Sequence, residues 1–529
     1  MSPTDDSNFT KDVRVRFAPS PTGWMHIGSI RQIIYNYLWA RACGGVFVLR
    51  IEDTDVKRTV DGGIDSIYEL MEAFGVESDE GPLQGGDYGP YVQSERLDLY
   101  TRYAEELVQK GAAYYCFCSK ERVDKLREEQ IANNVQPKYD RRCRGLSKLE
   151  VQKRIAAGEK YVIRLAVPQT GVTEYDDVLH GRIPFKNRVI DDQILLKSDR
   201  FPTYHFAAVI DDHLMKITHV IRGDEYVSSA PKVVLMYKAF GWNIPYLIQT
   251  PNVLNPDGRK KLSKRGGSNT AHKFLRKGYI VEALWNFLVL LGWSPKGSLA
   301  KRDEIYSCDE LVELFDVRRI QKSGARFLYD KLDHFNGYYI RSMDLDCLMN
   351  RIIEWAESYV LKDFVADSFV ELESWEKDMR ATVQMYLPLW KKDKEYFLSI
   401  LALTRERIRY FSQIPEITSF FYDESFSYKK DEFDILDYKS KSSVLDGIWR
   451  KLKPEVEHSW SQDTWESTIR GFADSVQWKH GDMFMLLRLA VTGKQVSPPL
   501  FETMRLMGIK LCDDRVRQVV TLLDSSHDE

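Results

Sequence analysis

A short apolar strand near the start of the chain runs into a turn that contains a histidine and two small hydroxyl residues. The stretch RFAPSPTGWMHIGS, residues 16–29, places two prolines and a glycine before a helix that is predicted to begin near His26. Proline fixes φ and glycine permits a tight turn, so this segment sets the spacing between strand and helix. The first amides of a helix are unpaired and attract anions. His26 would add a donor to a phosphate, and Gly28 would let a flat ring approach the backbone. Taken alone, such a turn is more often purely structural.

A lysine-rich loop follows much later in the chain. PDGRKKLSKRGG, residues 256–267, contains Lys261 and Lys264 three positions apart with a serine between them. Residues 251–277 carry eight basic residues and one acidic residue. Lysines spaced in this way can hold a polyphosphate as mobile point charges, although a charge run by itself is usually a solvated loop. The loop and the helix start together predict a nucleotide site.

A third group of residues has the chemistry of a metal site. Cys116 and Cys118 are two apart, Cys143 follows later, and Tyr139 precedes Cys143 by four positions. Three thiols and a fourth donor can hold zinc in a tetrahedron. Against this interpretation, C-x-C is less common than C-x-x-C and tyrosine is a rare zinc ligand. A zinc site and three unmetallated thiols both remain open.

The elements around these residues alternate in α/β fashion. Strands are expected at 13–17 and 46–53, and helices at 30–44, 61–74 and 95–110. Strand, helix and strand with a short crossover predict a doubly wound parallel sheet, in which ligands bind at the carboxyl ends of the strands. Cysteines, basic helices and short strands interrupt this pattern, and helical spacing dominates the last third of the chain.

Composition limits the class of protein. The chain has 529 residues, a net charge of −3 and an odd number of cysteines, seven. Basic residues exceed acidic ones by five within residues 120–160, which is consistent either with a phosphate-binding surface or with a solvated face. The N-terminus has no apolar signal region, and no apolar run approaches the ~20 residues that cross a bilayer. These features predict a cytoplasmic protein with reduced thiols and no membrane partner.

Several motifs occur in the order found in one enzyme family. HIGS at 26–29 resembles the HIGH motif, and KLSKR at 261–265 resembles the KMSKS motif, of class I aminoacyl-tRNA synthetases. FAPSPTG at 17–23, RIEDTD at 50–55, FPTYHFA at 201–207 and VIRGDE at 220–225 resemble the glutamyl-tRNA synthetase family of the bacterial or organellar type.

This resemblance implies a fold and an activity. The fold is α/β, a class I synthetase Rossmann-like doubly wound parallel sheet with an inserted acceptor-binding domain, followed by an all-α anticodon-binding region. The activity is ATP-dependent ligation of L-glutamate to tRNA(Glu) through a glutamyl-adenylate, with Mg²⁺ and release of AMP and pyrophosphate, by a monomer. The expected domains are 1–113 and 201–255 for the two catalytic halves, 114–200 for the acceptor-arm insertion, 256–345 for the KLSKR-loop and stem-contact domain, and 346–529 for the anticodon-binding domain.

The resemblance also assigns residues to the amino acid and to ATP. A planar guanidinium grips a carboxylate with two hydrogen bonds, so an arginine in the pocket would select glutamate over glutamine. Ala208 departs from the family, because many relatives place an asparagine there. The expected glutamate contacts are Arg16, Ala18, Ser20, Glu52, Tyr204 and Arg222. The expected ATP contacts are His26, Gly28, Lys261 and Lys264, of which His26, Lys261 and Lys264 are the catalytic residues.

Two more sets follow from the resemblance. Cys116, Cys118, Tyr139 and Cys143 match the zinc site that some members carry in the insertion that touches the tRNA acceptor arm. Arg407, Arg488, Ser497 and Leu500 fall where the family reads anticodon bases, although ordinary helix-surface arginines would give the same pattern.

Two alternative functions remain open. A glutaminyl-tRNA synthetase would share the motifs, but the C-terminal β-barrel expected of it is not apparent in the sequence. A tRNA-binding paralogue without catalysis would usually have lost the HIGH or KMSKS motif, and both are intact here.

Overall fold

Two compact units make up the chain in a computed structural model. The structure describes residues 6–55, 58–262, 269–301, 303–368, 371–422, 428, 430–438, 440–458 and 461–524. The first unit contains residues 1–274, 281–335 and 364–371, and the second contains residues 275–280, 336–363 and 372–529. The five-domain division expected from the sequence remains a prediction.

The first unit begins with a parallel strand pair joined by a helix. Strand β1 (Arg14–Phe17) pairs in parallel with β2 (Val46–Leu49), and α1 (Ile27–Ala42) connects them. The apolar residues of α1 that the sequence places on one face, such as Ile30, Ile33 and Leu38, are buried. This β-α-β unit is the one that the periodicity predicted.

A four-stranded mixed sheet continues the α/β part. Strand β8 (His219–Gly223) pairs in parallel with β9 (Tyr246–Thr250), and β9 pairs in parallel with β5 (Val172–Asp177). Strand β6 (Gly181–Lys186) pairs antiparallel with β5 at the edge, in the order β6-β5-β9-β8. The backbone N–H of Thr218, just before β8, donates a hydrogen bond to the carbonyl of Arg14 at 3.0 Å, which ties this sheet to β1.

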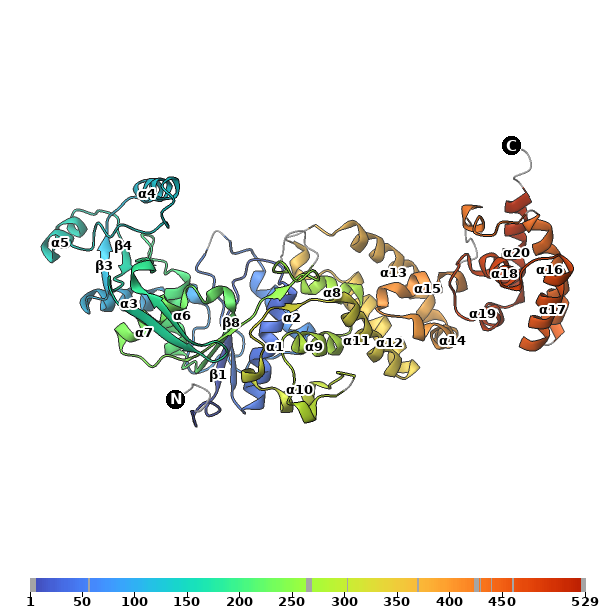
Figure 1. The fold of residues 1–529 in the computed structure, drawn as a ribbon, viewed down its shortest axis with the longest axis horizontal. Helices are drawn as coiled ribbons and strands as arrows, with labels where there is room; N and C mark the ends of the chain where they lie inside the picture. Colours follow the sequence, from blue (N-terminus) through green and yellow to red (C-terminus); the bar gives the residue numbers. More distant parts are fainter. Residues whose placement is uncertain are drawn as a thin grey trace. The chain divides into compact units, whose positions relative to one another are not determined.

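The predicted insertion also contains a separate antiparallel sheet. Its order is β3 (Ala113–Cys116), β4 (Val162–Leu165) and β7 (Ile194–Leu196). Helices α4 (Lys120–Ala132) and α5 (Lys148–Ala156) lie beside the ends of β3 and β4 (Figure 1).

Helices cover the sheets of the first unit and lead to its remaining segments. A short parallel pair, β10 with β11, follows the main sheet. The further elements of this part are α2 (Gly63–Ala73), α3 (Leu97–Gln109), α6 (Tyr204–Leu214), α7 (Ala230–Phe240), β10 (Val253–Leu254), α8 (Ala271–Lys277), α9 (Val281–Leu290), α10 (Cys308–Leu314), β11 (Ala325–Arg326) and α11 (Tyr329–Ser342).

Helices are the only regular secondary structure among the described residues of the second unit, as the sequence predicted. Trp449, Trp465, Leu486 and Leu487 belong to the apolar core of its C-terminal part. Among the described helices, none is both long enough and apolar enough to cross a bilayer. The helices are α12 (Leu345–Trp355), α13 (Ser374–Lys392), α14 (Lys394–Thr404), α15 (Ile414–Thr418), α16 (Lys441–His458), α17 (Gln462–Ser475), α18 (His480–Thr492), α19 (Leu500–Met507) and α20 (Ile509–Asp524) (Figure 1).

Candidate functional site

The predicted phosphate-binding turn is the junction between β1 and α1. His26 is the N-cap of α1, and its Nδ1 accepts a hydrogen bond from the backbone N–H of Gly28 at 3.0 Å. A Cβ atom on Gly28 would lie only 3.0 Å from that same Nδ1, so the close approach favours glycine. The imidazole therefore has a fixed position at the positive end of the helix dipole.

A cavity of about 470 Å³ opens beside this helix start. His26, Gly28 and Ser29 line it, together with Gly223 at the end of β8. Lys261 also lines it, with Nζ 3.3 Å from Oε2 of Glu225. The structure thus brings His26, Gly28 and Lys261 to one cavity, whereas Lys264 lies outside the described residues.

Arg222 is a buried cation with unused donors. Its side chain is 8% exposed, and Nε and Nη2 make no hydrogen bond to any residue that the structure describes. The guanidinium lies over the ring of Tyr226, 4.7 Å from its centroid, and that ring stacks on Tyr204 at 5.7 Å. Burial lowers the pKa of Arg222, and the nearby charge of Arg16 lowers it further. Nε and Nη2 form the edge of a guanidinium that grips a carboxylate, so the site is suited to an anion.

Glu52 is a buried anion with one unused oxygen. Its Oε1 accepts a hydrogen bond from Nη2 of Arg50 at 2.9 Å, while Oε2 has no hydrogen-bond partner among the described residues. Burial raises the pKa of Glu52, and the charges of Arg50 and Arg16 work in the opposite direction. An ammonium group would complete the hydrogen bonding of Oε2.

Arg16 and Tyr204 belong to the same site. Arg16 Nε lies 3.0 Å from Oδ1 of Asp212, and its charge interacts with those of Glu52 and Arg222. Burial raises the pKa of Tyr204, and the charge of Glu52 raises it further. The predicted glutamate residues Arg16, Glu52, Tyr204 and Arg222 are therefore neighbours.

The remaining predicted glutamate residues are less enclosed. Ala18 is half-buried and Ser20 is exposed in the turn after β1. Ala208 is buried on α6. It lies one helical turn from Tyr204 and one from Asp212, on the same helix face.

Sequence reasoning missed three members of this site. Arg50, Asp212 and Tyr226 hold or stack on the predicted residues but belong to no assigned set. Asp212 is distant in sequence from both of its partners, since Arg16 is 196 and Arg50 is 162 residues away. The DDH sequence after FPTYHFA was the available signal.

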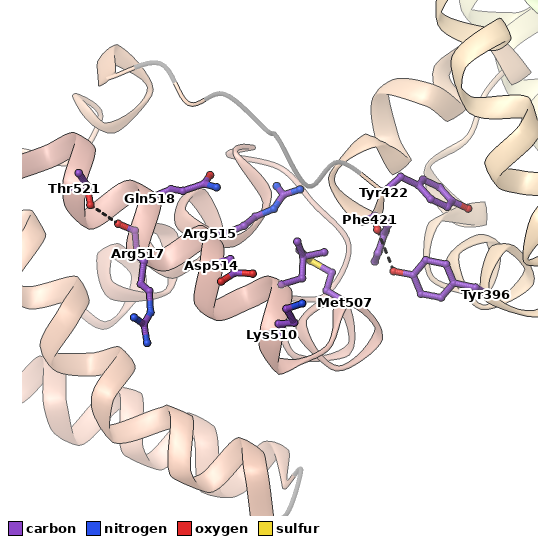
Figure 2. Close-up of a pocket in the computed structure, with 11 residues that line it drawn as sticks. Tyr396, Phe421, Tyr422, Met507, Lys510, Asp514, Arg515, Arg517, Gln518 and Thr521 are labelled. Carbon is purple, nitrogen blue, oxygen red and sulfur yellow. Dashed lines mark hydrogen bonds between the residues drawn. The ribbon is translucent and has the colours of Figure 1, made fainter.

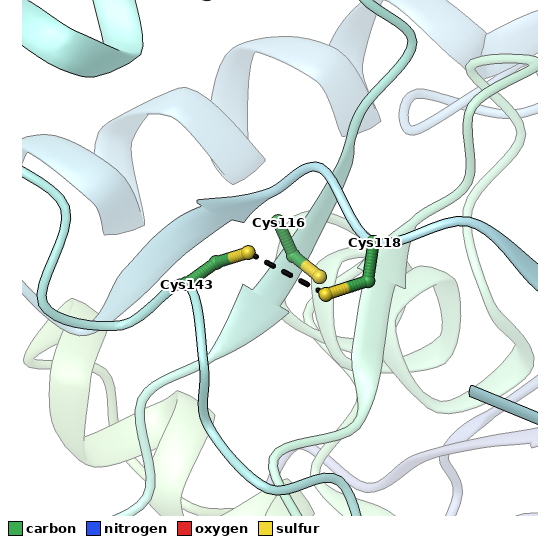
Figure 3. Close-up of side chains that lie close together, drawn as sticks. All are labelled: Cys116, Cys118 and Cys143. Carbon is green, nitrogen blue, oxygen red and sulfur yellow. Dashed lines mark hydrogen bonds between the residues drawn. The ribbon is translucent and has the colours of Figure 1, made fainter. Parts of the chain in front are cut away.

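The three predicted cysteines converge on Tyr139. Their Sγ atoms all lie within 4.8 Å of one another and point toward a common centre (Figure 3). Cys118 Sγ is 3.6 Å from Cys143 Sγ, and Tyr139 Oη is 3.3 Å from the sulfurs of both Cys116 and Cys118. Burial acts to raise the pKa of Cys143, but hydrogen bonding with Tyr139 and the other thiols outweighs it and lowers that pKa.

These distances fit a tetrahedral zinc site. Zn–S bonds of about 2.3 Å imply sulfur–sulfur edges of about 3.8 Å, and a Zn–O bond of about 2.1 Å implies sulfur–oxygen edges of about 3.6 Å. The chain segment that carries Tyr139 and Cys143 is anchored by two carboxylates. The backbone N–H of Tyr139 donates to Asp191 at 2.8 Å, and Arg141 donates to Asp192 at 3.0 Å.

Three of the four predicted anticodon residues gather in the second unit. Nη1 of Arg488, in α18, donates to the backbone carbonyls of Ser497 at 3.2 Å and Pro498 at 3.0 Å. Arg407 and Ser497 line a cavity of about 210 Å³. Burial lowers the pKa of Arg488, and the charge of Arg407 lowers it further. Leu500, by contrast, is the buried first residue of α19 and packs in the helical core.

A larger cavity of about 860 Å³ in the same unit was not signalled by any motif. Tyr396, Phe421 and Tyr422 lie on one side of it, and residues of α20 such as Lys510 and Arg517 lie on the other (Figure 2). Tyr396 donates a hydrogen bond to the backbone carbonyl of Phe421 at 3.2 Å, which fixes that wall.

Comparisons with protein families cover nearly all of the chain. Residues 12–334 match the model described as "tRNA synthetases class I (E and Q), catalytic domain". Residues 365–520 match the model described as "Anticodon binding domain".

Individual proteins are similar over the same length. A glutamate–tRNA ligase from Dehalococcoides mccartyi is 40% identical over 518 residues, covering 97% of this chain and 99% of that protein. One from Treponema denticola is 41% identical over 514 residues, covering 96% and 99%. The crystal structure of a glutamate tRNA ligase from Elizabethkingia meningosepticum, in complex with its amino acid, matches with a TM-score of 0.77 at 32% identity. That match covers 97% of this chain and 100% of the other.

Proposed function

The chain belongs to the glutamate–tRNA ligases of the class I tRNA synthetases, and from this premise we propose how its own residues join L-glutamate to tRNA(Glu). The reaction takes glutamate, ATP and tRNA to glutamyl-tRNA, AMP and pyrophosphate. The residue assignment rests on polar atoms of the buried site that have no hydrogen-bond partner among the described residues. These atoms are Nε and Nη2 of Arg222 and Oε2 of Glu52.

Glutamate fits this pair by charge and by geometry. We assign its side-chain carboxylate to Nε and Nη2 of Arg222, with Arg16 close by, and its ammonium group to Oε2 of Glu52. A glutamine side chain would turn an NH₂ donor toward a cation that only donates, which leaves buried groups unpaired.

The charge of the buried cluster supports the same choice. The buried Arg96–Asp211 pair adjoins the site, since Asp211 Oδ2 lies 3.8 Å from Arg50 Nε. With this pair included, four guanidiniums face three carboxylates, so the cluster carries one excess positive charge. Zwitterionic glutamate has a net charge of −1 and neutralises it, whereas glutamine does not. The members of the cluster are Arg16, Arg50, Arg96, Arg222, Glu52, Asp211 and Asp212.

ATP is assigned to the cavity beside α1. The α-carboxylate of glutamate attacks the α-phosphorus, the bond to the β-phosphate oxygen breaks, and pyrophosphate leaves. A carboxylate is already ionised at pH 7, so this step needs no general base. His26, Lys261 and Lys264 stabilise charge on the phosphoryl oxygens, and bound Mg²⁺ would neutralise the pyrophosphate. Gly28 leaves room for the nucleotide, and the neighbouring β1 turn, with Ala18 and Ser20, fixes the distance between the two reactants.

The second step transfers the glutamyl group to RNA. The 2′-hydroxyl of the terminal adenosine attacks the mixed anhydride, its proton leaves with the phosphate side, and AMP departs. We assign the acceptor arm to the inserted segment 114–200 and the anticodon to Arg407, Arg488 and Ser497. Leu500, also predicted for this role, is buried in the helical core and would not touch a base itself. Arginines reach base edges and stack on splayed bases, which suits this role.

Zinc is proposed for the cysteine cluster. Cys116, Cys118, Cys143 and Tyr139 would hold one structural Zn²⁺, which when bound fixes the segment that leads from β3 into α4. The metal would take no part in the ligation. The seven free thiols fit a reducing compartment, so we place the protein in the cytoplasm, and we expect a monomer.

The experiment that tests this function is ATP–pyrophosphate exchange with glutamate or glutamine, with and without tRNA. We expect exchange with glutamate and none with glutamine, and by family resemblance we expect a requirement for tRNA. Arg222→Lys keeps the charge but cannot bind a carboxylate bidentately. It should therefore raise the KM for glutamate by about 10- to 100-fold. Exchange supported by glutamine alone would overturn the proposal.

A further inference from the structure

Asp212 occupies the edge of Arg16 that would otherwise grip a carboxylate. Nε of Arg16 lies 3.0 Å from Oδ1 and Nη2 lies 3.5 Å from Oδ2, with both side chains buried. Nη1 of Arg16 is left without a hydrogen bond to any described residue. Arg16 therefore offers the substrate Nη1 and the second N–H of Nη2, whereas Arg222 keeps its Nε–Nη2 edge open.

The same carboxylate also holds a second arginine. Nη1 of Arg50 donates to Oδ1 of Asp212 at 2.8 Å, and Nη2 of Arg50 donates to Glu52 at 2.9 Å. Arg50 is fully buried. A chain of charge-assisted hydrogen bonds thus runs from Arg16 through Asp212 and Arg50 to Glu52. It joins the two ends of the amino-acid site, the end for the side chain and the end for the ammonium group.

The residues of this hydrogen-bond chain lie in, or directly after, regular secondary structure. Arg16 is in β1, and Arg50 and Glu52 directly follow β2, which pairs with β1 in register. Asp212 lies in α6 on the same face as Tyr204, two helical turns away. A carboxylate in this place sets the orientation of residues from two segments, β1 and the residues that follow β2.

We propose that Asp212 is a positioning residue for glutamate activation, which fixes the orientation of Arg16 and, through Arg50, that of Glu52. This inference rests on the proposed function of the site. Asp212 touches no substrate atom. It holds Arg16 Nη1 and Glu52 Oε2 in the orientation that binds the amino acid before the amino acid arrives. Binding then loses less side-chain conformational entropy.

Steady-state ATP–pyrophosphate exchange on the full-length protein, with tRNA present, tests this role. Asp212→Asn keeps the shape but replaces one acceptor oxygen by a donor that faces an arginine. It should raise the KM for glutamate by about 10- to 100-fold, because one or two charge-assisted hydrogen bonds are lost. The KM for ATP should stay within about threefold. Asp212→Glu retains both acceptor oxygens and should recover most of the loss.

Glu80→Gln is the matched control. Glu80 accepts two hydrogen bonds from Arg14, which is two residues from Arg16 in β1, and it lies outside the amino-acid site. This variant breaks the ion pair of an arginine that lies on the same strand as Arg16. Its KM for glutamate should stay within about twofold of that of the unmodified protein.

A double-mutant cycle separates positioning from a general structural role. If Asp212 acts through Arg16, then Asp212→Asn should have a much smaller effect on the KM for glutamate in an Arg16→Lys background. Additive effects of the two substitutions would overturn the inference. So would equal rises in the KM values for glutamate and for ATP, or a rise in the KM for glutamate in Glu80→Gln as large as that in Asp212→Asn. If Asp212→Asn does not fold, the cycle is run with Asp212→Ser, which also removes the carboxylate, and additivity there decides in the same way. Failure of the proposed function would show instead in the unmodified protein, as absent glutamate-dependent exchange.

Discussion

Arg50 Nη2 lies 2.9 Å from Oε1 of Glu52, and both side chains are fully buried. One oxygen of Glu52 is thereby used inside the protein and the other remains for the substrate ammonium. Glu52→Gln should lower kcat/KM for glutamate by at least about 100-fold, because removing one charge of a buried pair costs about 3–5 kcal/mol. Exchange assays with Glu80→Gln as the control measure this. A loss of less than about threefold would show that Glu52 only neutralises Arg50.

Metal content tests the cysteine cluster. Protein purified under reducing conditions should contain about one zinc per chain by elemental analysis. Cys118→Ser should remove it, whereas Cys308→Ser, which changes an exposed thiol outside the cluster, should retain it.

Tyr139→Phe probes the fourth ligand. If the phenol oxygen binds the metal, its removal should weaken zinc affinity by at least about tenfold in a competition with a chelator. Equal zinc affinity in this variant would leave only the three thiols as ligands. Zinc-free protein with unchanged stability would favour three unmetallated thiols.

The anticodon assignment predicts a loss that is confined to tRNA. Arg488→Ala should raise the KM for tRNA by about 10- to 100-fold, with the KM values for glutamate and ATP unchanged. Arg470→Ala, which removes an exposed arginine paired with Glu466 in α17, is the control. Equal effects of the two variants would indicate a general electrostatic contribution rather than recognition by Arg488.

His219 predicts a pH dependence of stability. Burial lowers its pKa from 6.5 to about 4, and its Nδ1 lies 2.8 Å from Thr218 Oγ1. Because the unfolded chain takes up this proton first, the free energy of unfolding should fall by about 3 kcal/mol as the pH drops from 6.5 to 4. Titration of isotope-labelled histidine by NMR gives the pKa directly. A value near 6.5 would contradict the buried, neutral ring.

The sequence predicted the parts of the site that local pattern encodes. The turn from residue 16 to 29 and the β-α-β unit follow from apolar periodicity and from the placement of proline and glycine. The cysteine spacing likewise predicted a cluster that the structure brings together. The identity of Arg222 and Glu52 came from the resemblance to a family and not from pattern.

What pattern could not supply are pairings across the fold. Asp212 bonds Arg16 and Arg50, which are distant in sequence, and no periodicity marks a buried carboxylate. Strand β5 falls within the predicted insertion, and no sequence pattern signalled its pairing with β9 of the main sheet at Asp177 and Leu247. Asp177 also accepts a hydrogen bond from the backbone N–H of Gln249 at 3.0 Å, which supports this strand pairing.

The most direct measurement of the central claim is the identity of the amino acid placed on tRNA. The protein is incubated with ATP, Mg²⁺, a tRNA pool and equal concentrations of glutamate and glutamine. The terminal adenosine is then released by nuclease and analysed by mass spectrometry. The account predicts glutamyl-adenosine, abolished by Arg222→Ala. Glutaminyl-adenosine, or no aminoacyl-adenosine from active, folded protein, would contradict it.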